Sequence, residues 1–264
     1  MKRDKILLNV DNLESIEKYE KLGISNFLFP LASYSVGYSS FSYEEIANTK
    51  VNAYVLVNRL LTDDDIDAFL KLEIPQNIRG FVIEDTGIYM ELANRGYTLI
   101  CFQNHLNANY KTCQYWLNYY DSLVLSTDIT ENEIETILAN ATKPLVLYTF
   151  GIPMIMYSRR KLVSNYYEAF DLGEKREVRI EDPRGDFEFK LKETEYGTAC
   201  FDSKILDARS SLDKFEDSKI LFYLVDTSGI EFEDVVKAIE DEYVENTTRG
   251  FLDKKTVYRI GDLK

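Results

Sequence analysis

Two acidic residues and one histidine are the side chains of this sequence best suited to acid–base chemistry. Glu84 and Asp85 end the apolar run GFVIED (residues 80–85), and His105 is the only histidine of the chain. Carboxylates can exchange protons with a substrate or bind a cation, so we take Glu84, Asp85 and His105 as candidate catalytic residues. Adjacent residues of a strand point to opposite faces, so only one of the two carboxylates can face a given site. The alternatives are a buried hydrogen-bonding role for Asp85 and a hydrogen-bonded position in the polar loop HLNAN for His105.

A short cationic segment contains the candidate ligand-binding residues. Arg159 and Arg160 follow Tyr157 and Ser158 shortly after an apolar, strand-like run. Guanidinium groups bind carboxylate and phosphate in a bidentate manner, so this segment suits an acidic ligand. The alternative is that the two arginines pair with some of the 45 acidic residues of the chain. Position near the ends of predicted strands adds further candidates, which are Asn58, Arg59 and Asn107.

Common catalytic and metal-binding signatures are absent from the sequence. It contains no GxSxG, Walker, GxGxxG or HExxH pattern. The three cysteines, Cys101, Cys113 and Cys200, form no CxxC pair, and their odd number favours a reducing compartment over a disulfide framework. Cys101 falls in an apolar strand and Cys113 on an apolar helix face, where free cysteine packs as a small hydrophobe. We therefore predict no metal site.

Charge and hydropathy exclude two classes of partner. The formal net charge of -14 and the pI near 4.7 argue against broad electrostatic attachment to nucleic acid. The N-terminal run KILLNV is too short for a signal peptide, and no window approaches the roughly eighteen apolar residues of a membrane span. We expect a cytoplasmic protein without membrane contact.

Short apolar runs alternate with amphipathic segments along most of the chain. The alternation indicates βα units around a parallel sheet, and runs that are apolar throughout indicate strands buried on both faces. About eight strands favour a closed (β/α)8, TIM-barrel-like α/β fold over an open doubly wound sheet. In such a barrel the ligand site lies at the carboxyl ends of the strands. The predicted strands are residues 5–10, 26–31, 52–60, 80–85, 98–102, 122–126, 144–150 and 219–226.

One region interrupts this alternation. REVRIE and FEFKLK flank the turn DPRGD and predict an antiparallel hairpin, to which TACFDSKIL adds a third run. We place a β insertion at about residues 174–207, before the last barrel strand. Thr62 and Asp65 predict a capping box at the start of the helix DDDIDAFLKL.

Five segments in order resemble the motifs of peptidase family U32, the collagenase-like peptidases. They are VIEDTG (82–87), HLNANYKTCQYW (105–116), YTFGIPMIMYSRRKL (148–162), VRIEDPRGDFEFKL (178–191) and TTRGFLDKKTVY (247–258). The resemblance covers most of the chain and implies a single U32-like barrel domain over residues 1–264. It names a peptidase, that is a hydrolase, without assigning a mechanism.

The resemblance also bears on cofactors. Other members of the family take part in hydroxylation of ubiquinone precursors and of RNA; these carry an iron–sulfur cluster on four cysteines, and prephenate is the implied oxygen donor. This chain has Lys161 where the family has a cluster cysteine, and Val146 and Phe150 where many members have Glu and His. Thiolates are needed to hold such a cluster, so we expect a cluster-free member without a cofactor.

Three functions remain open on these grounds. The first is a peptidase or peptidase-like hydrolase acting on a peptide. The second is a cluster-free accessory protein of RNA or small-molecule hydroxylation, which binds an acidic metabolite and meets RNA only as an indirect modification target. The third is a non-catalytic ligand-binding barrel that partners a larger member of the U32 family.

Overall fold

Eight apolar segments form the parallel strands of the molecule. The computed structural model describes residues 1–103, 105–185 and 187–255. Each observed strand coincides with a predicted one to within a few residues. The strands are β1 (Ile6–Asn9), β2 (Asn26–Pro30), β3 (Asn52–Val57), β4 (Ile78–Ile83), β5 (Thr98–Cys101), β6 (Ser122–Leu123), β7 (Leu145–Gly151) and β13 (Ile220–Asp226).

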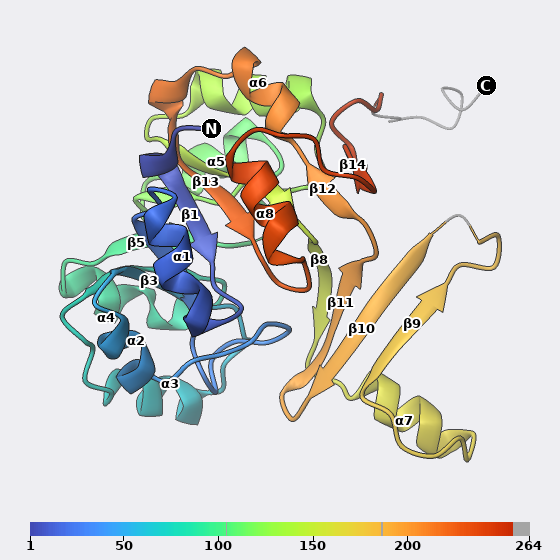
Figure 1. Ribbon diagram of the computed structural model, residues 1–264. Coiled ribbons are helices and arrows are strands. Elements are labelled where there is room, and N and C mark those ends of the chain that lie inside the picture. Colours follow the sequence, from blue (N-terminus) through green and yellow to red (C-terminus); the bar gives the residue numbers. More distant parts are fainter. Residues whose placement is uncertain (104, 186, 256–264) are drawn as a thin grey trace.

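These strands belong to a curled, mainly parallel sheet in the form of a half barrel (Figure 1). Within the described residues the strand order is β14-β12-β7-β13-β1-β2-β3-β4-β5-β6. Two short strands extend one edge: β12 (Ile205–Asp207), which is antiparallel to β7, and β14 (Thr247–Thr248). The protein is therefore a mixed α/β fold, as predicted.

Helices follow most of the parallel strands. The α-helices beside the main sheet are α1 (Ile16–Lys21), α2 (Tyr43–Thr49), α3 (Asp63–Leu70), α4 (Tyr89–Asn94), α5 (Tyr110–Trp116), α6 (Glu131–Asn140) and α8 (Phe232–Ile239). Short 3₁₀-helices are η1 (Arg3–Lys5), η2 (Leu13–Ser15), η3 (Thr86–Ile88), η4 (Arg209–Lys214) and η5 (Asp217–Lys219). The predicted capping box of Thr62 and Asp65 is confirmed at α3. Further boxes begin α2 and α6.

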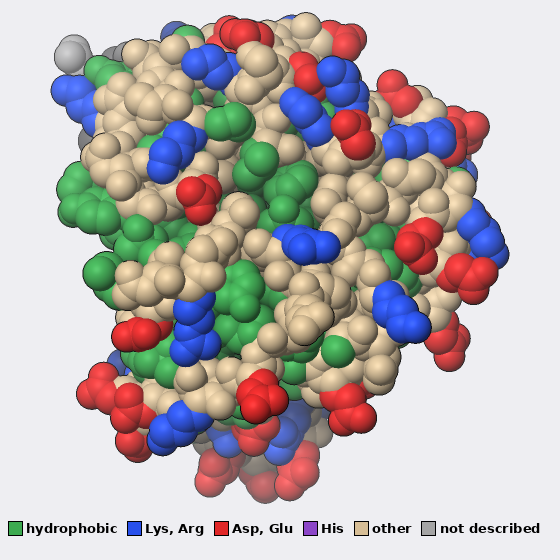
Figure 2. Space-filling model, turned by 90° about the vertical axis from the view of Figure 1, so that its left-hand side faces the viewer, with side chains coloured by type: hydrophobic (Ala, Val, Ile, Leu, Met, Phe, Trp, Pro, Cys, Tyr) green, Lys and Arg blue, Asp and Glu red, His purple; other side chains and the backbone are tan. Residues whose placement is uncertain are grey.

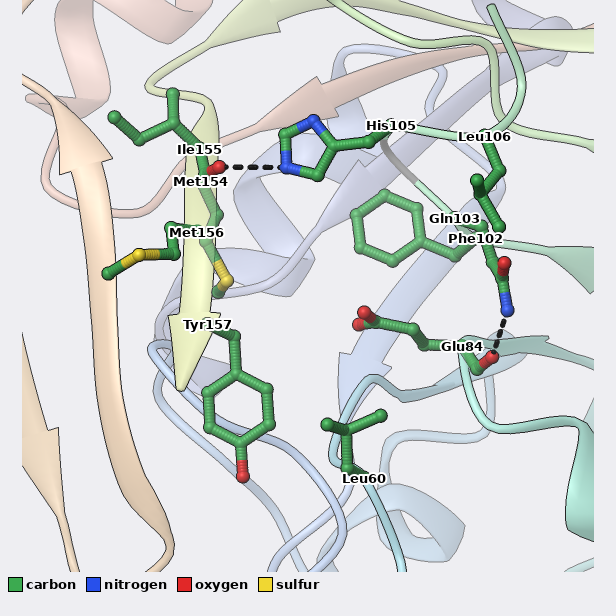
Figure 3. A pocket seen from close by; sticks show the side chains of 10 residues that line it. All are labelled: Leu60, Glu84, Phe102, Gln103, His105, Leu106, Met154, Ile155, Met156 and Tyr157. Carbon is green, nitrogen blue, oxygen red and sulfur yellow. Dashed lines mark hydrogen bonds between the residues drawn. The ribbon is translucent and has the colours of Figure 1, made fainter. Parts of the chain in front are cut away.

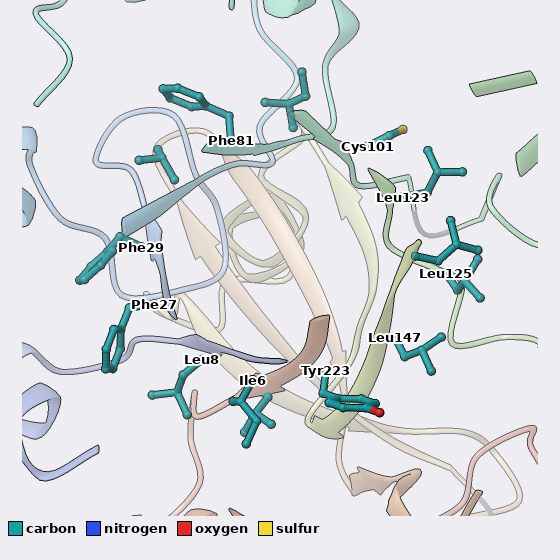
Figure 4. Close-up of a cluster of buried hydrophobic side chains, with 14 of the residues drawn as sticks. Ile6, Leu8, Phe27, Phe29, Phe81, Cys101, Leu123, Leu125, Leu147 and Tyr223 are labelled. Atoms are coloured by element: carbon teal, nitrogen blue, oxygen red, sulfur yellow. The ribbon is translucent and has the colours of Figure 1, made fainter. Parts of the chain in front are cut away.

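Alternate residues of each strand enter different cores. Ile6 and Leu8 join the larger cluster, which packs between the strands and the helices, and Figure 4 shows their side chains pointing away from the curled sheet. Leu7 lies between them in sequence and joins a second cluster with Val82 and Val146, on the inner side of the sheet. Both faces of the strands are thus buried, which explains why most of their residues are apolar.

A second sheet stands beside the first. Its order is β8-β11-β10-β9, with strands β8 (Met154–Ser158), β9 (Glu177–Glu181), β10 (Glu188–Thr194) and β11 (Gly197–Asp202). Its strand pairs are antiparallel, and the predicted hairpin is confirmed as β9–β10. α7 (Leu162–Ala169) covers one face through Val163, Leu191 and Cys200. The second sheet begins at Met154, before the start predicted for the insertion, because β8 pairs with β11. At the other end, residues 205–207 form β12 and belong to the main sheet.

The surface mixes charges of both signs. On the side of the molecule seen in Figure 2, Lys and Arg side chains are interspersed with Asp and Glu around exposed hydrophobic side chains. Among the described residues, no helix combines the length and the apolar character that crossing a bilayer requires.

In the C-terminal motif, Arg249 pairs with Asp253 and Glu131, and residues 256–258 lie outside the described part.

Phe81 belongs to the larger apolar cluster, and we expect truncation of its side chain to cause a large loss of stability. Its side chain is 0% exposed, and its ring packs edge-on against Phe69 and Tyr97, with centroids 6.1 and 5.2 Å away. We expect Phe81→Ala to lower the free energy of unfolding by about 3–5 kcal/mol, measured by urea denaturation. Phe170→Ala, at a ring that is 62% exposed, serves as the control and should cost less than about 1 kcal/mol. Equal losses in the two variants would contradict this.

Candidate active site

A pocket of about 330 Å³ lies between the carboxyl ends of β3, β4 and β5 and the strand β8. Figure 3 shows side chains from both sides facing one another across it. The pocket brings together three of the predicted site residues, Glu84, His105 and Tyr157, although 73 positions of sequence separate the first from the last. The other lining residues are Leu60, Phe102, Gln103, Leu106, Met154, Ile155 and Met156.

Glu84 follows β4, and its carboxylate points into the pocket toward β8 (Figure 3). Its main chain is held on both sides, since its N–H donates to the Val57 carbonyl at 3.0 Å and its carbonyl accepts from the Gln103 amide at 2.9 Å. The carboxylate forms no hydrogen bond or ion pair with any described residue. Burial, with the neighbouring Asp85 carboxylate, raises the pKa of Glu84 to about 7. Such a group can accept or release a proton near neutral pH.

Asp85 does not line the pocket. Its carboxylate accepts hydrogen bonds from the backbone N–H groups of Gly87 and Leu61, both at 2.8 Å. It therefore caps η3 and ties the segment after β4 to the segment after β3. The opposite directions of the Glu84 and Asp85 side chains agree with the alternation expected along a strand.

His105 bridges the loop after β5 to the second sheet. Its Nε2 lies 3.0 Å from the Ile155 carbonyl oxygen (Figure 3). Its Nδ1 lies 3.1 Å from Asp128 Oδ2. Both partners are acceptors, so the ring satisfies both at once when both nitrogens carry protons. In this position His105 holds β8 against the pocket, and its part in catalysis stays a prediction.

The cationic segment lies at the end of β8. Tyr157 donates its hydroxyl to the Tyr196 carbonyl at 2.9 Å, and Ser158 Oγ accepts from the Arg160 N–H at 3.2 Å. Arg159 and Arg160 are exposed and do not line the pocket. Neither forms an ion pair with a residue in the described part of the chain. Ligand binding by these four residues stays a prediction.

Asn58 and Arg59 hold the loop of residues 31–42, which passes over the carboxyl end of the sheet. The Asn58 amide is 0% exposed; it accepts from the Val36 N–H at 3.0 Å and donates to the Val36 carbonyl at 3.2 Å. Arg59 donates to the Ser33 carbonyl and to Asp65, and its guanidinium stacks 4.1 Å from the centre of the Tyr196 ring. Both side chains are occupied by the protein itself.

Asn107, the third residue predicted from strand-end position, is also internal. It is 0% exposed and donates to the Val124 carbonyl at 3.0 Å, which links the loop after β5 to the end of β6. In this position it supports the loop that carries His105 rather than lining the pocket.

Sequence reasoning missed a buried polar cluster centred on Asp226 at the end of β13. Its carboxylate accepts from the Asn9 amide at 2.9 Å, the Ser228 N–H at 3.0 Å and the Tyr148 hydroxyl at 3.1 Å. Burial raises the pKa of Asp226 to about 6 against those hydrogen bonds, which lower it. Asn9 is the last residue of β1 and Asp226 the last residue of β13, and no local sequence signal indicates that they touch. The register that pairs them is tertiary.

Tyr38 lies beside this cluster. It lines a cavity of about 10 Å³ with Asn9, Tyr148 and Asp226, and its ring packs edge-on against Phe201 at 5.6 Å. Burial raises the pKa of Tyr38, and the Asp226 and Glu84 carboxylates add to the effect. Phe102 lines both this cavity and the Glu84 pocket.

Gly37 allows this arrangement. Its φ is +83°, and a Cβ there would lie 2.6 Å from Met154 and 2.7 Å from Phe201. A side chain would therefore both strain the backbone and push the loop away from the second sheet.

The cysteines do not fit a four-cysteine iron–sulfur cluster. Cys101, Cys113 and Cys200 are buried free thiols on β5, α5 and β11, and burial raises the pKa of each. A four-cysteine cluster needs four thiolate ligands, and the sequence contains three cysteines. Lys161, at the position of a cluster cysteine, is exposed. Among the described residues, no group of His, Cys, Asp and Glu is arranged to hold a metal ion.

The Asp226 cluster predicts a pH dependence of stability. Because folding raises the pKa of Asp226 from 3.8 to about 6, its contribution to stability is complete below pH 4 and is lost as the pH rises through 6. The loss is about 3 kcal/mol. The Asp226→Asn variant has no ionisable group at this position and does not lose stability in this way. The difference in free energy of unfolding between the variant and the wild type should therefore increase in favour of the variant by about that amount from pH 4 to 8. Urea denaturation across this range checks it. Exposed Asp67→Asn is the control, and a pH-independent difference for Asp226→Asn would contradict us.

The loop over the sheet depends on Asn58. Asn58→Ala leaves the Val36 N–H and carbonyl without partners, which should lower the free energy of unfolding by about 2–4 kcal/mol. Proteolytic cleavage within residues 31–42 should become faster, as detected by mass spectrometry. Exposed Asn94→Ala should change stability by less than about 0.5 kcal/mol. Unchanged cleavage in Asn58→Ala would refute the anchoring role.

Three solved structures resemble the chain at low identity. The C-terminal domain of a putative chitinase from Desulfitobacterium hafniense DCB-2 is 12% identical, with 90% of this chain and 98% of that chain covered and a TM-score of 0.42. The spore cortex-lytic enzyme SleL of Bacillus megaterium QM B1551 is 10% identical (92% and 75% covered, TM-score 0.43). SleL of Bacillus cereus is 12% identical (94% and 76% covered, TM-score 0.38). TM-scores this low support no conclusion about the fold or the function of this chain.

Sequence comparison identifies the family. We found no curated protein that matches the chain. The model of peptidase family U32 matches residues 40–246, which include β3–β13 with the Glu84 pocket and the whole second sheet. This range is well over half of the 264 residues. The chain belongs to peptidase family U32.

Proposed function

We propose that this protein is a peptidase-like hydrolase whose active site is the Glu84 pocket, with Glu84 as the general base. The family supplies the reaction class. The observation that carries the proposal is a carboxylate without a hydrogen-bonding partner among the described residues, facing an open pocket, with its pKa raised to about 7. A general base is most effective when its pKa lies near the working pH.

The proposed reaction needs water and the peptide. Glu84 takes a proton from a water molecule, whose oxygen attacks the carbonyl carbon of the peptide bond. The bond from that carbon to nitrogen then breaks, and the proton passes from Glu84 to the departing amine. Atoms and charges balance, and the carboxylate is regenerated.

The walls of the pocket support this role. Leu60, Phe102, Leu106, Met154 and Met156 make most of the lining apolar. Apolar walls disfavour the charged form of Glu84, which is the cause of its raised pKa. The same walls can receive apolar side chains of a substrate, because burying them is favourable.

We further propose that the parallel strands close into a (β/α)8 barrel. In support, a parallel bridge joins Val124, just after β6, to Val146 of β7, and the Leu125 N–H donates to the Val146 carbonyl at 3.0 Å. The inner apolar cluster draws on strands all around the sheet, from Leu7 to Leu224. The Glu84 pocket would then occupy the end of the barrel where ligands bind.

The proposal predicts a specific effect of removing the Glu84 charge. Glu84→Gln should lower kcat/KM for casein or gelatin at least 100-fold, since general-base catalysis contributes about 10²–10⁴ in rate. Wild-type kcat/KM should rise with pH through about 7, as the carboxylate forms. Fluorogenic casein and gelatin digestion by purified protein measures both.

The matched control is Glu91→Gln, at an exposed carboxylate on α4, which should keep wild-type activity. Activity of Glu84→Gln equal to that of wild type would exclude Glu84 as the base. Failure of the wild-type protein to cleave either substrate between pH 5 and 9 would count against hydrolysis of these proteins altogether.

A further inference from the structure

One edge of the second sheet opens into the Glu84 pocket. β8 pairs with β11 on one side, and no strand in the described part of the chain pairs with its other side. The Ile155 carbonyl points to that open side, because it accepts from His105 Nε2 at 3.0 Å across the pocket. The Asp202 N–H donates to the Pro153 carbonyl at 3.0 Å, so Asp202, Cys200 and Thr198 of β11 turn their backbone groups toward β8. Tyr157 pairs with Ala199, which lies between Cys200 and Thr198, so the N–H and carbonyl of Tyr157 point to the open side. No hydrogen bond to a described residue outside the sheet ladder uses them.

The two edges of this sheet differ in a way that indicates what each can bind. The far edge, β9, carries Glu177, Arg179 and Glu181, and charges of this kind prevent pairing with another chain. The near edge is β8, whose sequence MIMYS contains no charged residue. Met156 is 42% exposed there. An apolar edge that faces a pocket and is open at Tyr157, beyond the contact of His105 with Ile155, is suited to receive a further strand.

We propose that an extended peptide binds as an added strand on β8, with its backbone hydrogen-bonded to the N–H and carbonyl of Tyr157. This inference rests on the proposed function, because it defines how the substrate of the Glu84 pocket is held. Adjacent strands lie about 4.8 Å apart, so the added backbone runs through the space between β8 and the carboxylate of Glu84 (Figure 3).

The substrate class follows from this geometry. Backbone pairing recognises any extended, unfolded segment and excludes a folded helix or turn, whose amides are already used. Alternate side chains of the peptide enter the apolar walls, and the flexible Met154 and Met156 side chains adapt to different shapes. Selectivity should therefore be for unfolded, apolar-containing segments rather than for one sequence.

The first experiment uses the full chain with Glu84→Gln, so that the probe is not cleaved. The probe is a fluorescent octapeptide of alternating Leu and Ser with blocked ends, and a series in which each amide in turn is N-methylated. Fluorescence anisotropy should show about tenfold weaker binding when the one amide that meets the Tyr157 carbonyl is methylated, and less than twofold change at the amides on either side of it. Successive amides of a strand point to opposite sides, so these neighbours face away from β8.

A second measurement does not depend on the probe series. Hydrogen exchange of the Tyr157 amide should slow at least tenfold when the octapeptide binds, while the amide of Arg179 on β9 should not change. Tyr157→Pro removes the amide and should abolish binding. Arg179→Pro removes an amide of the far edge strand β9 instead and should bind within threefold of the parent.

The outcomes separate this inference from the proposed function. Sensitivity at a single amide with protection at Tyr157, but no cleavage by wild type, would keep the strand-addition site and reject the hydrolase. Cleavage that depends on Glu84 without a methylation-sensitive amide, or with exchange protection elsewhere, would keep the hydrolase and overturn strand addition. Absence of saturable binding up to millimolar peptide would also overturn it.

Discussion

Burial of both faces of the parallel strands is the constraint on which the rest of this structure depends. One face packs against the helices through residues such as Ile6 and Phe81, and the other packs inward through Leu7 and Val82. Most residues of the strands are therefore apolar, and polar side chains become frequent where the strands end. Because parallel strands end at the same side of a sheet, the polar residues that follow them are brought together there without any attraction between them.

Two carboxylates at this end carry a raised pKa for the same first reason, burial, but their surroundings differ. Asp226 is enclosed and accepts three hydrogen bonds, which offset part of the cost of burying its charge. Glu84 has no such partner among the described residues, and its carboxylate faces a pocket. The first arrangement stabilises a fixed network, whereas the second leaves lone pairs available to a water molecule or substrate. Tyr38 lines the small cavity beside Asp226 and does not line the Glu84 pocket.

The second sheet completes the pocket from outside the main sheet. β8 leaves the end of β7 almost at once, and His105 holds its Ile155 carbonyl from across the pocket. Gly37 lets the loop of residues 31–42 lie against Met154 and Phe201, which closes the space above Asp226 while leaving the Glu84 side open. The shape of the site is thus set by contacts among a loop, a strand edge and one histidine.

Local pattern was sufficient to predict the strands, the capping box at Thr62, the β9–β10 hairpin and the family, since each depends on neighbours in sequence. The strand-end rule also pointed to Glu84. It could not tell Glu84 from Asn58 and Asn107, because a polar residue at a strand end looks the same whether it faces a ligand or anchors a loop. The pairing of Asn9 with Asp226, and of β8 with β11, joins segments far apart in the chain. The tertiary structure decided these, because register and long-range packing are set by the summed contacts of the whole core rather than by adjacent residues.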